Sequence, residues 1–200
     1  MTLQNRVTPD GRIISAAVRG MFMGNRGILH DDQQRLGAAR WRHRNWVCCV
    51  TAFKGRKRTL MAPRRYTELF FLDEAVALAA GHRPCAECRR ADFNRFRDAW
   101  GRAFGVVPSA PDLDRGLHQS RVAGRAPRTY VAPAQTLPPG AMLRSVGELW
   151  LVLPGAMRAY APTGYGLCAP LPDGLVEVLT PAVTVATLRA GYAPALHPTA

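Results

Sequence analysis

The chain has 200 residues, which corresponds to one ordinary domain or at most two small ones. Hydrophobic residues make up 48% of it, enough to bury a core, so a wholly disordered basic tail is excluded. No apolar stretch approaches the roughly 18 residues that a membrane helix needs, and the first residues contain no signal-peptide core. We therefore expect a cytoplasmic protein outside the membrane, whose five cysteines are metal ligands or buried thiols.

Positive charge is concentrated near the N-terminus. The chain carries 27 Lys and Arg against 14 Asp and Glu, a formal charge of +13. Residues 1–66 hold 14 basic and 3 acidic side chains, a net charge of +11, whereas residues 67–108 balance at 6 each and residues 109–200 reach +2 from 7 and 5. This uneven distribution is typical of proteins that bind a polyanion. A solvated basic face without a partner is the alternative.

The first 66 residues are predicted to be irregular and rich in short strands. Residues 6–14 predict two strands around a Pro-Asp-Gly turn, and residues 21–23 precede a Gly-Asn-Arg-Gly loop. Residues 46–53 predict a further strand. We expect it to form a hairpin with Arg58–Met61 across the turn Lys54-Gly55-Arg56.

Two helices are expected next. Asp73 is a good N-cap for a helix that runs to Ala80, and Gly81 suits the position after its end. A second helix is predicted from Arg90 to Phe104, because aromatic residues recur at spacings of 3, 4 and 4 and form one apolar stripe. The stripe consists of Phe93, Phe96, Trp100 and Phe104.

The C-terminal part is predicted to be rich in strands. Residues 105–140 are rich in proline and indicate a connection that holds a short helix at Asp112–Val122. A last helix is expected between Thr180-Pro181 and Gly191. Strand-like runs occur at Ala141–Arg144, Leu149–Leu153, Gly166–Ala169 and Leu175–Leu179.

These elements predict the α+β fold class. We expect a zinc-stapled N-terminal module of β-hairpin and helix, followed by a small β-rich C-terminal region with a terminal helix. The predicted organisation is a basic zinc-binding module with two helices over residues 1–108, a connecting region over 109–140 and the β-rich region over 141–200.

A C-x-x-C motif carries the strongest chemical signal. Cys85 and Cys88 are spaced so that both thiolates can bind one tetrahedral Zn²⁺. Gly81 and Pro84 precede the motif, so it lies in a turn between two helices. A redox C-x-x-C more often opens a helix after a strand, and we therefore predict a metal site.

The C-x-x-C supplies half of a zinc site, so two further ligands are expected upstream. Side chains alternate along a strand, and only one of two adjacent cysteines normally faces the metal. His82, beside the motif, is predicted to point outward, and the isolated Cys168 is predicted to be a buried apolar residue. In order of preference, the upstream candidates are Cys49 or Cys48, then His43, then His30. Buried thiols without a metal are the alternative.

Residues 70–89 carry a family resemblance. They contain an aromatic pair, a capped helix with Glu-Ala, and then Gly-His-Arg-Pro-Cys-Ala-Glu-Cys. This pattern resembles the end of the metal-binding domain of Ada-type DNA-repair proteins, over roughly residues 44–90. The resemblance implies a Zn²⁺ bound by Cys85, Cys88 and two ligands from an upstream β-hairpin, together with contact to DNA phosphates. The whole chain is also similar to a family of bacterial proteins of similar length.

This sequence departs from the Ada-type pattern at one point. Ada-type domains have two separated upstream cysteines, one of which accepts a methyl group from a phosphotriester, and this chain has the adjacent pair Cys48-Cys49.

Basic and aromatic residues lie between the two halves of the predicted metal site. Arginine contacts phosphates, and the interleaved Trp41 and Trp46 either stack on bases or belong to the core. The predicted nucleic-acid-binding residues are Arg42, Arg44, Lys54, Arg56, Lys57, Arg58, Arg64 and Arg65.

We therefore expect a zinc-containing protein that grips the DNA backbone through a basic hairpin, in DNA repair or gene control. One alternative is an enzyme acting on DNA: a metal-dependent nuclease built on His30, Asp31, Asp32 and His43, or a zinc-thiolate alkyl-transfer enzyme. Another is a structural zinc protein whose partner is a protein. No catalytic residue is assigned, since the chain has no Walker loop, dinucleotide fingerprint or nucleophile elbow.

Overall fold

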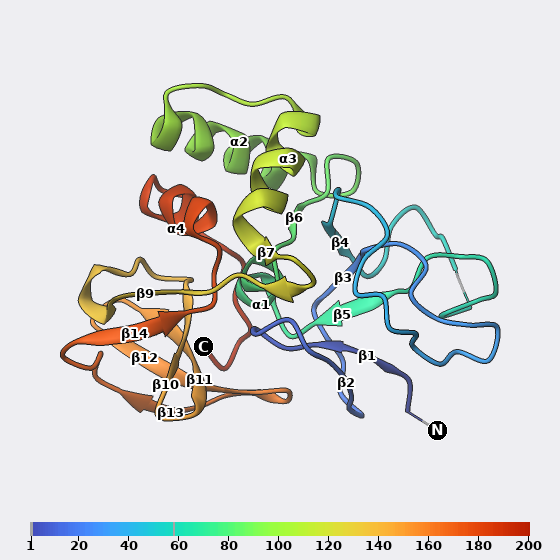
Figure 1. Ribbon diagram of the computed structural model, residues 1–200, viewed down its shortest axis with the longest axis horizontal. Helices are drawn as coiled ribbons and strands as arrows, with labels where there is room; N and C mark the ends of the chain where they lie inside the picture. The colour runs from blue at the N-terminus through green and yellow to red at the C-terminus, as the bar shows by residue number, and fades with distance from the viewer. Residues whose placement is uncertain (1, 58) are drawn as a thin grey trace.

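Two six-stranded sheets lie on either side of a short central helix (Figure 1). The computed structural model describes residues 2–57 and 59–200. The central helix is α1 (Glu74–Ala79). The other α-helices gather on one side of the molecule: α2 (Arg90–Phe104), α3 (Ala110–Arg121) and α4 (Ala182–Arg189).

The N-terminal sheet has the strand order β2-β1-β5-β3-β4-β6. Its β1–β5 and β4–β6 pairs are parallel and its other pairs antiparallel. Because β4 lies between β3 and β6, both of its edges are hydrogen-bonded. The strands are β1 (Gln4–Val7), β2 (Ile13–Ser15), β3 (Phe22–Asn25), β4 (Val47–Val50), β5 (Leu69–Phe71) and β6 (Arg83–Pro84).

The C-terminal sheet is antiparallel throughout, with the order β13-β12-β11-β10-β14-β9. A two-stranded ribbon and a 3-10 turn precede most of it: β7 (Val122–Ala123), β8 (Ala126–Pro127) and η1 (Ala134–Thr136). The strands of the sheet are β9 (Tyr130–Pro133), β10 (Met142–Ser145), β11 (Glu148–Leu153), β12 (Ala156–Ala161), β13 (Gly164–Ala169) and β14 (Leu175–Val178).

The predicted α+β class and the two helices expected before and after the C-x-x-C motif, α1 and α2, are confirmed. The Asp73 carboxylate accepts the amide N–H of Val76 at 2.9 Å, so it caps α1 as expected. Helix α2 has the predicted bounds and ends in a left-handed Gly105. Of its aromatic stripe, Phe104 is 45% exposed, and the other three residues are buried in the core.

Several strands differ from the prediction. The hairpin partner expected at residues 58–61 is wrong for Thr59–Met61, which form no strand, and Arg58 lies outside the described residues. The reason is that β3 and β6 already occupy both edges of β4. Strand β12 was not predicted. The proline-rich connection contains the predicted helix, as α3, and also the strands β7, β8 and β9, which were not predicted.

The two sheets share a hydrophobic core around α1. Buried residues of the helix, such as Val76 and Ala77, form one cluster with Phe71 of the N-terminal sheet and Leu151 of the C-terminal sheet. A second cluster joins α2, α3 and α4 to the C-terminal sheet. The predicted boundaries at 108 and 140 stay a prediction. Within the described ranges, no helix has the length and apolar character required to cross a bilayer.

Candidate metal centre

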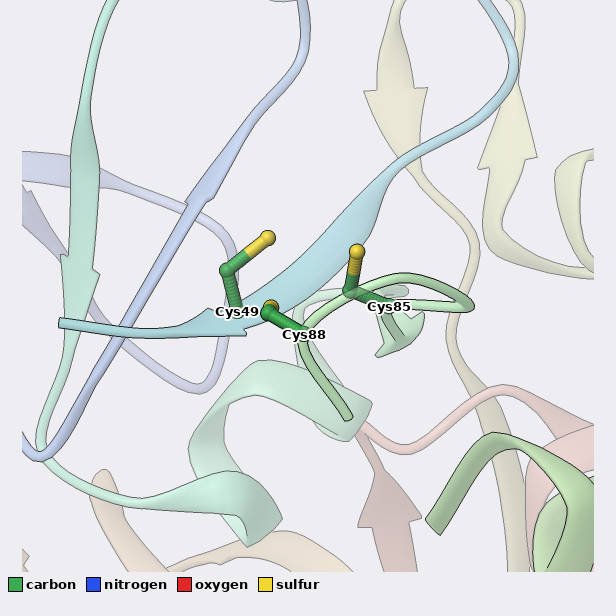
Figure 2. A group of neighbouring side chains, drawn as sticks. All are labelled: Cys49, Cys85 and Cys88. Atoms are coloured by element: carbon green, nitrogen blue, oxygen red, sulfur yellow. The ribbon is translucent and has the colours of Figure 1, made fainter. Parts of the chain in front are cut away.

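Three cysteine side chains converge at the edge of the N-terminal sheet. Cys49 comes from β4, whereas Cys85 and Cys88 come from the turn between β6 and α2. Their sulfur atoms all lie within 4.8 Å of one another, and each side chain is half-buried (Figure 2). Through the part of the chain that the structure describes, no other group of His, Cys, Asp and Glu is arranged to hold a metal.

Backbone pairing holds the cysteine turn against β4. Gly81 leaves α1 with a φ of +83°, a conformation that favours glycine, and turns the chain into β6. Strand β6 pairs in parallel with β4, so that Pro84 lies opposite Cys48. The amide of Cys85 then donates to the Cys48 carbonyl oxygen at 2.9 Å. The position of the C-x-x-C therefore depends on the sheet and not only on its local turn.

The turn favours a negatively charged sulfur at Cys85. A hydrogen bond from the Cys49 thiol lowers the pKa of Cys85 to about 5. The Glu87 amide also donates to the Cys85 sulfur, at 3.4 Å. Burial instead raises the pKa of Cys88. A bound metal takes cysteine as the thiolate, so part of the required charge state is already stabilised here.

The donor set fits Zn²⁺. Tetrahedral coordination with bonds of about 2.3 Å places thiolate sulfurs about 3.8 Å apart, which is compatible with three sulfurs that lie within 4.8 Å of one another. Thiolates are soft ligands that select zinc over magnesium or calcium. Three cysteines leave one tetrahedral position for a ligand from outside the described cluster.

A pocket of about 340 Å³ adjoins the cluster. Cys49, Cys85 and Cys88 form part of its wall. The carboxylate of Glu68 also lines it, and this side chain is only 2% exposed. Glu68 Oε2 accepts the Met61 amide at 2.8 Å. A small molecule in this pocket would lie beside the thiolates.

Three of the upstream candidates, Cys48, His43 and His30, lie outside the cluster. Cys48 is fully buried on the opposite face of β4, where the Arg89 guanidinium donates to its sulfur at 3.4 Å and burial raises its pKa well above the usual value. The reason is the alternation of side chains along the strand, which selects Cys49 instead. His43 is hydrogen-bonded through Nε2 to Asn25 Oδ1 at 3.0 Å, and burial lowers its pKa.

The other histidines have structural contacts. His30 Nδ1 is 2.6 Å from Thr67 Oγ1, and its Nε2 is 3.3 Å from the Ala62 carbonyl oxygen. His82 is fully buried between the rings of Phe71 and Trp46, so the prediction that it points outward is wrong. Cys168 is exposed, and the prediction that it is buried is wrong as well.

The residues suggested for a nuclease are not assembled into a site. Asp31 accepts backbone amides of its own loop and forms an ion pair with Arg35 at 3.0 Å. Asp32 is exposed, and neither aspartate groups with His30 or His43 around a metal position within the described ranges.

The predicted basic residues lie on two irregular segments, one before β4 and one after it, and not on a hairpin. Arg56 reaches from the segment after β4 to Glu87 of the cysteine turn, with 2.9 Å between Nη2 and Oε1. It also lies over the Phe53 ring, as does Lys54. All predicted nucleic-acid-binding residues within the described ranges are exposed: Arg42, Arg44, Lys54, Arg56, Lys57, Arg64 and Arg65.

Sequence reasoning missed two buried arginines, Arg26 and Arg121, and the pocket residue Glu68. These three residues are far apart in the sequence, and no motif around any of them indicates that it lines a pocket. The one indirect clue is Gly81, since a Cβ there would lie 2.4 Å from the side chain of Arg121.

Comparisons of the chain with protein-family models, with curated proteins and with solved structures give no match. The resemblance to Ada-type domains stays a prediction, and function has to be argued from the geometry of the site.

Proposed function

We propose that this protein is a zinc protein that binds DNA through its phosphate backbone. A Zn²⁺ bound by Cys49, Cys85 and Cys88 would tie the cysteine turn to β4. The basic loop that follows β4 would contact the DNA; its exposed basic residues are Lys54, Arg56, Lys57, Arg64 and Arg65. The observation that carries the proposal is the connection between these parts. The loop leaves the metal-binding strand directly, and Arg56 pairs with Glu87 between two of the cysteines.

The charge distribution supports this assignment. Residues 1–66 have a net charge of +11, and their basic side chains named above project into solvent. Exposed Arg and Lys contact phosphates without reading sequence. We therefore infer that the protein binds DNA with little sequence specificity. Such binding is compatible with a role in DNA repair or gene control. The Gly-x-Arg-Pro-Cys-x-x-Cys run, which resembles the Ada-type domain, agrees with it.

The pocket beside the cysteines favours a second candidate, a metal-dependent enzyme acting on DNA. Catalytic zinc sites have three protein ligands and bind water at the fourth position, and three cysteines meet this condition. Zinc supplies a Lewis acid that lowers the pKa of bound water. The Glu68 carboxylate on the pocket wall would accept a hydrogen bond from a substrate or water molecule.

Binding of duplex DNA at several salt concentrations tests the leading proposal. Each phosphate contact contributes about −0.9 to the slope of log K against log salt, so four or five contacts give roughly −4. Replacement of Lys57, Arg64 and Arg65 by Ala should flatten the slope by about 2 to 3 and weaken all sequences alike.

The matched control replaces Arg19, Arg95 and Arg115 by Ala. These residues are exposed and belong to other segments of the chain than the basic loop. Their replacement removes the same formal charge. Equal flattening in both triple variants would show that net charge alone holds the DNA.

Recovery of uncut DNA after incubation with zinc, magnesium or manganese would contradict the second candidate, the metal-dependent enzyme acting on DNA.

A further inference from the structure

A second pocket, of about 200 Å³, is lined by arginine and tryptophan and shares no residue with the pocket beside the cysteines. It lies where the β7–β8 ribbon, the end of α1 and the loop before β4 meet. Trp41 and Trp46 form part of its wall. Its arginines are Arg12, Arg26, Arg40, Arg121, Arg125 and Arg128. Such a concentration of guanidinium groups around one small cavity produces a strongly positive site.

Two of these arginines are buried without an acidic partner. Arg26 and Arg121 are each 3% exposed, and neither pairs with a carboxylate within the described residues. Arg26 donates to the Ala80 carbonyl at 3.2 Å and to His82 Nε2 at 3.4 Å, and Arg121 donates to the Gly81 carbonyl at 2.6 Å. These carbonyls, at the negative end of α1, offset only part of two full positive charges.

The hydrogen-bonding capacity of Arg121 is not used up. Its Nη2 donates to the Arg44 carbonyl and lies 3.1 Å from His118 Nδ1, but its buried Nε has no partner. Burial, followed by the charge of Arg26, lowers the pKa of Arg121 to about 8, and burial with the charge of Arg40 lowers that of Arg26 to about 9. Buried cations of this kind are costly unless a counter-charge is present.

The acidic residue at the pocket cannot supply that counter-charge. Asp10 is the one carboxylate among the lining residues. It pairs with Arg12 at the edge of the pocket, at 2.9 Å, and with Arg144, at 3.1 Å, not with Arg26 or Arg121. The charge of Asp114, which is paired with Arg83, offsets part of the charge of Arg121. The remaining charge of Arg121 and the charge of Arg26 are left for an anion from outside the chain.

The aromatic wall indicates what kind of anion fits. The guanidinium carbons of Arg26 and Arg121 lie 4.3 Å and 3.7 Å from the centre of the Trp46 ring, which is fixed by its Nε1–H bond to the His43 carbonyl. Trp41, half-buried, lies 5.8 Å from Trp46. Arginine forks match phosphate oxygens, and a tryptophan ring at the opening of such a site can stack on a base.

We propose that this pocket binds a nucleotide, with its phosphate between Arg26 and Arg121 and its base against Trp41. The volume of about 200 Å³ suits one phosphate with the adjoining sugar and excludes a stretch of duplex. The nucleotide is either free in solution or the phosphorylated end of a strand. The inference depends neither on the metal nor on the basic loop.

Calorimetry in phosphate-free buffer tests the ligand class with dAMP, deoxyadenosine and inorganic phosphate. We expect dAMP to bind at least about tenfold more tightly than deoxyadenosine, because charge-assisted hydrogen bonds to the phosphate are lost in the nucleoside. Inorganic phosphate should bind more weakly than dAMP, since it lacks a base. Equal binding of dAMP and deoxyadenosine, or of dAMP and inorganic phosphate, overturns the proposal.

Two short single strands of one sequence, with and without a 5′-phosphate, distinguish the sources. Tighter binding of the phosphorylated strand than of both dAMP and the other strand assigns the pocket to strand ends. Binding of dAMP at least as tight as that of the phosphorylated strand assigns it to free nucleotides. If both strands bind alike and dAMP does not bind, the pocket has no role and the proposal fails.

Variants locate the binding site. Arg121→Met and Arg26→Met should each weaken dAMP binding by about tenfold or more, since each removes charged donors. The exposed pair Arg40→Ala with Arg128→Ala should weaken it severalfold, and this variant keeps the test valid if a buried replacement does not fold. Arg19→Ala removes the same charge as each single replacement, from outside the pocket. Unchanged binding in the Arg40/Arg128 variant, or equal loss in Arg19→Ala, contradicts the proposal.

Discussion

Two adjacent cysteines have opposite environments, and this difference is decided at the scale of single residues. Cys49 lies among the converging thiols, whereas Cys48 is packed in the core beneath Arg89. Loss of a residue that only hydrogen-bonds to a metal ligand weakens metal binding by roughly 10–100-fold. We expect Cys49→Ala to weaken zinc binding by more than this, because it removes a ligand itself. Cys48→Ala should still bind one zinc per chain. Competition with a chromophoric chelator measures both affinities.

The two alanine variants control for each other, because they remove the same atoms from neighbouring positions. Equal loss of zinc from both would show that the metal is not held by the face of β4 that carries Cys49.

A buried histidine should make the stability depend on pH. Burial, reinforced by the charges of Arg26 and Arg121, holds the pKa of His82 well below its usual value. The unfolded chain takes up a proton here near pH 6.5, while the folded chain does not, so the unfolded state binds more protons below that pH. The free energy of unfolding should therefore fall by about 1 kcal/mol for each pH unit below 6.5.

His82→Gln keeps an acceptor for Arg26 but cannot titrate. Urea unfolding at about pH 7.5 and pH 5.5 should show a smaller loss of stability in this variant than in the unmodified chain. Burial also lowers the pKa of His43 and His118, so part of the slope should remain. An identical slope in both proteins would mean that His82 does not titrate on unfolding.

At the scale of elements, a buried ion pair connects β6 to α3. Arg83 and Asp114 form two hydrogen bonds, Nε to Oδ1 at 2.8 Å and Nη2 to Oδ2 at 2.7 Å, with side chains 5% and 12% exposed. Asp114→Ala leaves the Arg83 charge buried and should lower the free energy of unfolding by about 3–5 kcal/mol. Denaturant unfolding measures this loss.

An exposed pair on the same helix gives the contrast. Arg115→Ala removes an ion pair with Asp112 whose side chains are more than half exposed, and it should cost less than about 1 kcal/mol. The double variant Arg83→Met with Asp114→Leu should lose less stability than Asp114→Ala, because no unpaired charge remains. If it loses more, packing and not charge holds β6 to α3.

The elements that were predictable from sequence are those with local signals. Asp73 and Gly81 mark both ends of α1, and the aromatic spacing of α2 fixes its bounds. Strand β6 has two residues and exists only because it pairs with β4, so no local pattern predicts it. The same limit applies to the loop after β4, whose hairpin partner was excluded by pairing with β3.

The candidate site follows the same division. The spacing of Cys85 and Cys88 pointed to a metal, whereas the choice between Cys48 and Cys49 depends on which face of β4 meets the cysteine turn. The positions of Arg26, Arg121 and Glu68 arise from packing between segments distant in sequence, and no spacing rule reports them.

At the scale of the whole molecule, the C-terminal segment (residues 192–200) is hydrogen-bonded to the start of α1. Tyr192 donates its hydroxyl to Glu74 at 2.6 Å, and the amide of Ala195 donates to the same carboxylate at 2.9 Å. Asp73 accepts the His197 amide at 3.1 Å, although burial raises the pKa of this carboxyl. The last residues of the chain therefore satisfy two buried acids of the central helix.

A chain of contacts leads from this segment to the cysteines. Glu74 forms a buried ion pair with Arg89 at 2.8 Å, and Arg89 follows Cys88 directly and donates to the Cys48 sulfur. Loss of the segment would leave Glu74 with fewer partners and loosen the residue that anchors the end of the cysteine turn. The two sheets should accordingly unfold together in one transition.

Removal of residues 192–200 tests this coupling. We expect a lower melting temperature and faster release of zinc to a chelator, because Arg89 loses a well-positioned partner and the cysteine turn opens more often. Tyr192→Phe is the milder control: it removes one hydrogen bond to Glu74, worth about 1 kcal/mol, and should change zinc release much less. Melting followed by tryptophan fluorescence and by far-UV circular dichroism should coincide. Zinc release at the unmodified rate from the shortened chain would show that the metal centre is independent of the C-terminal segment.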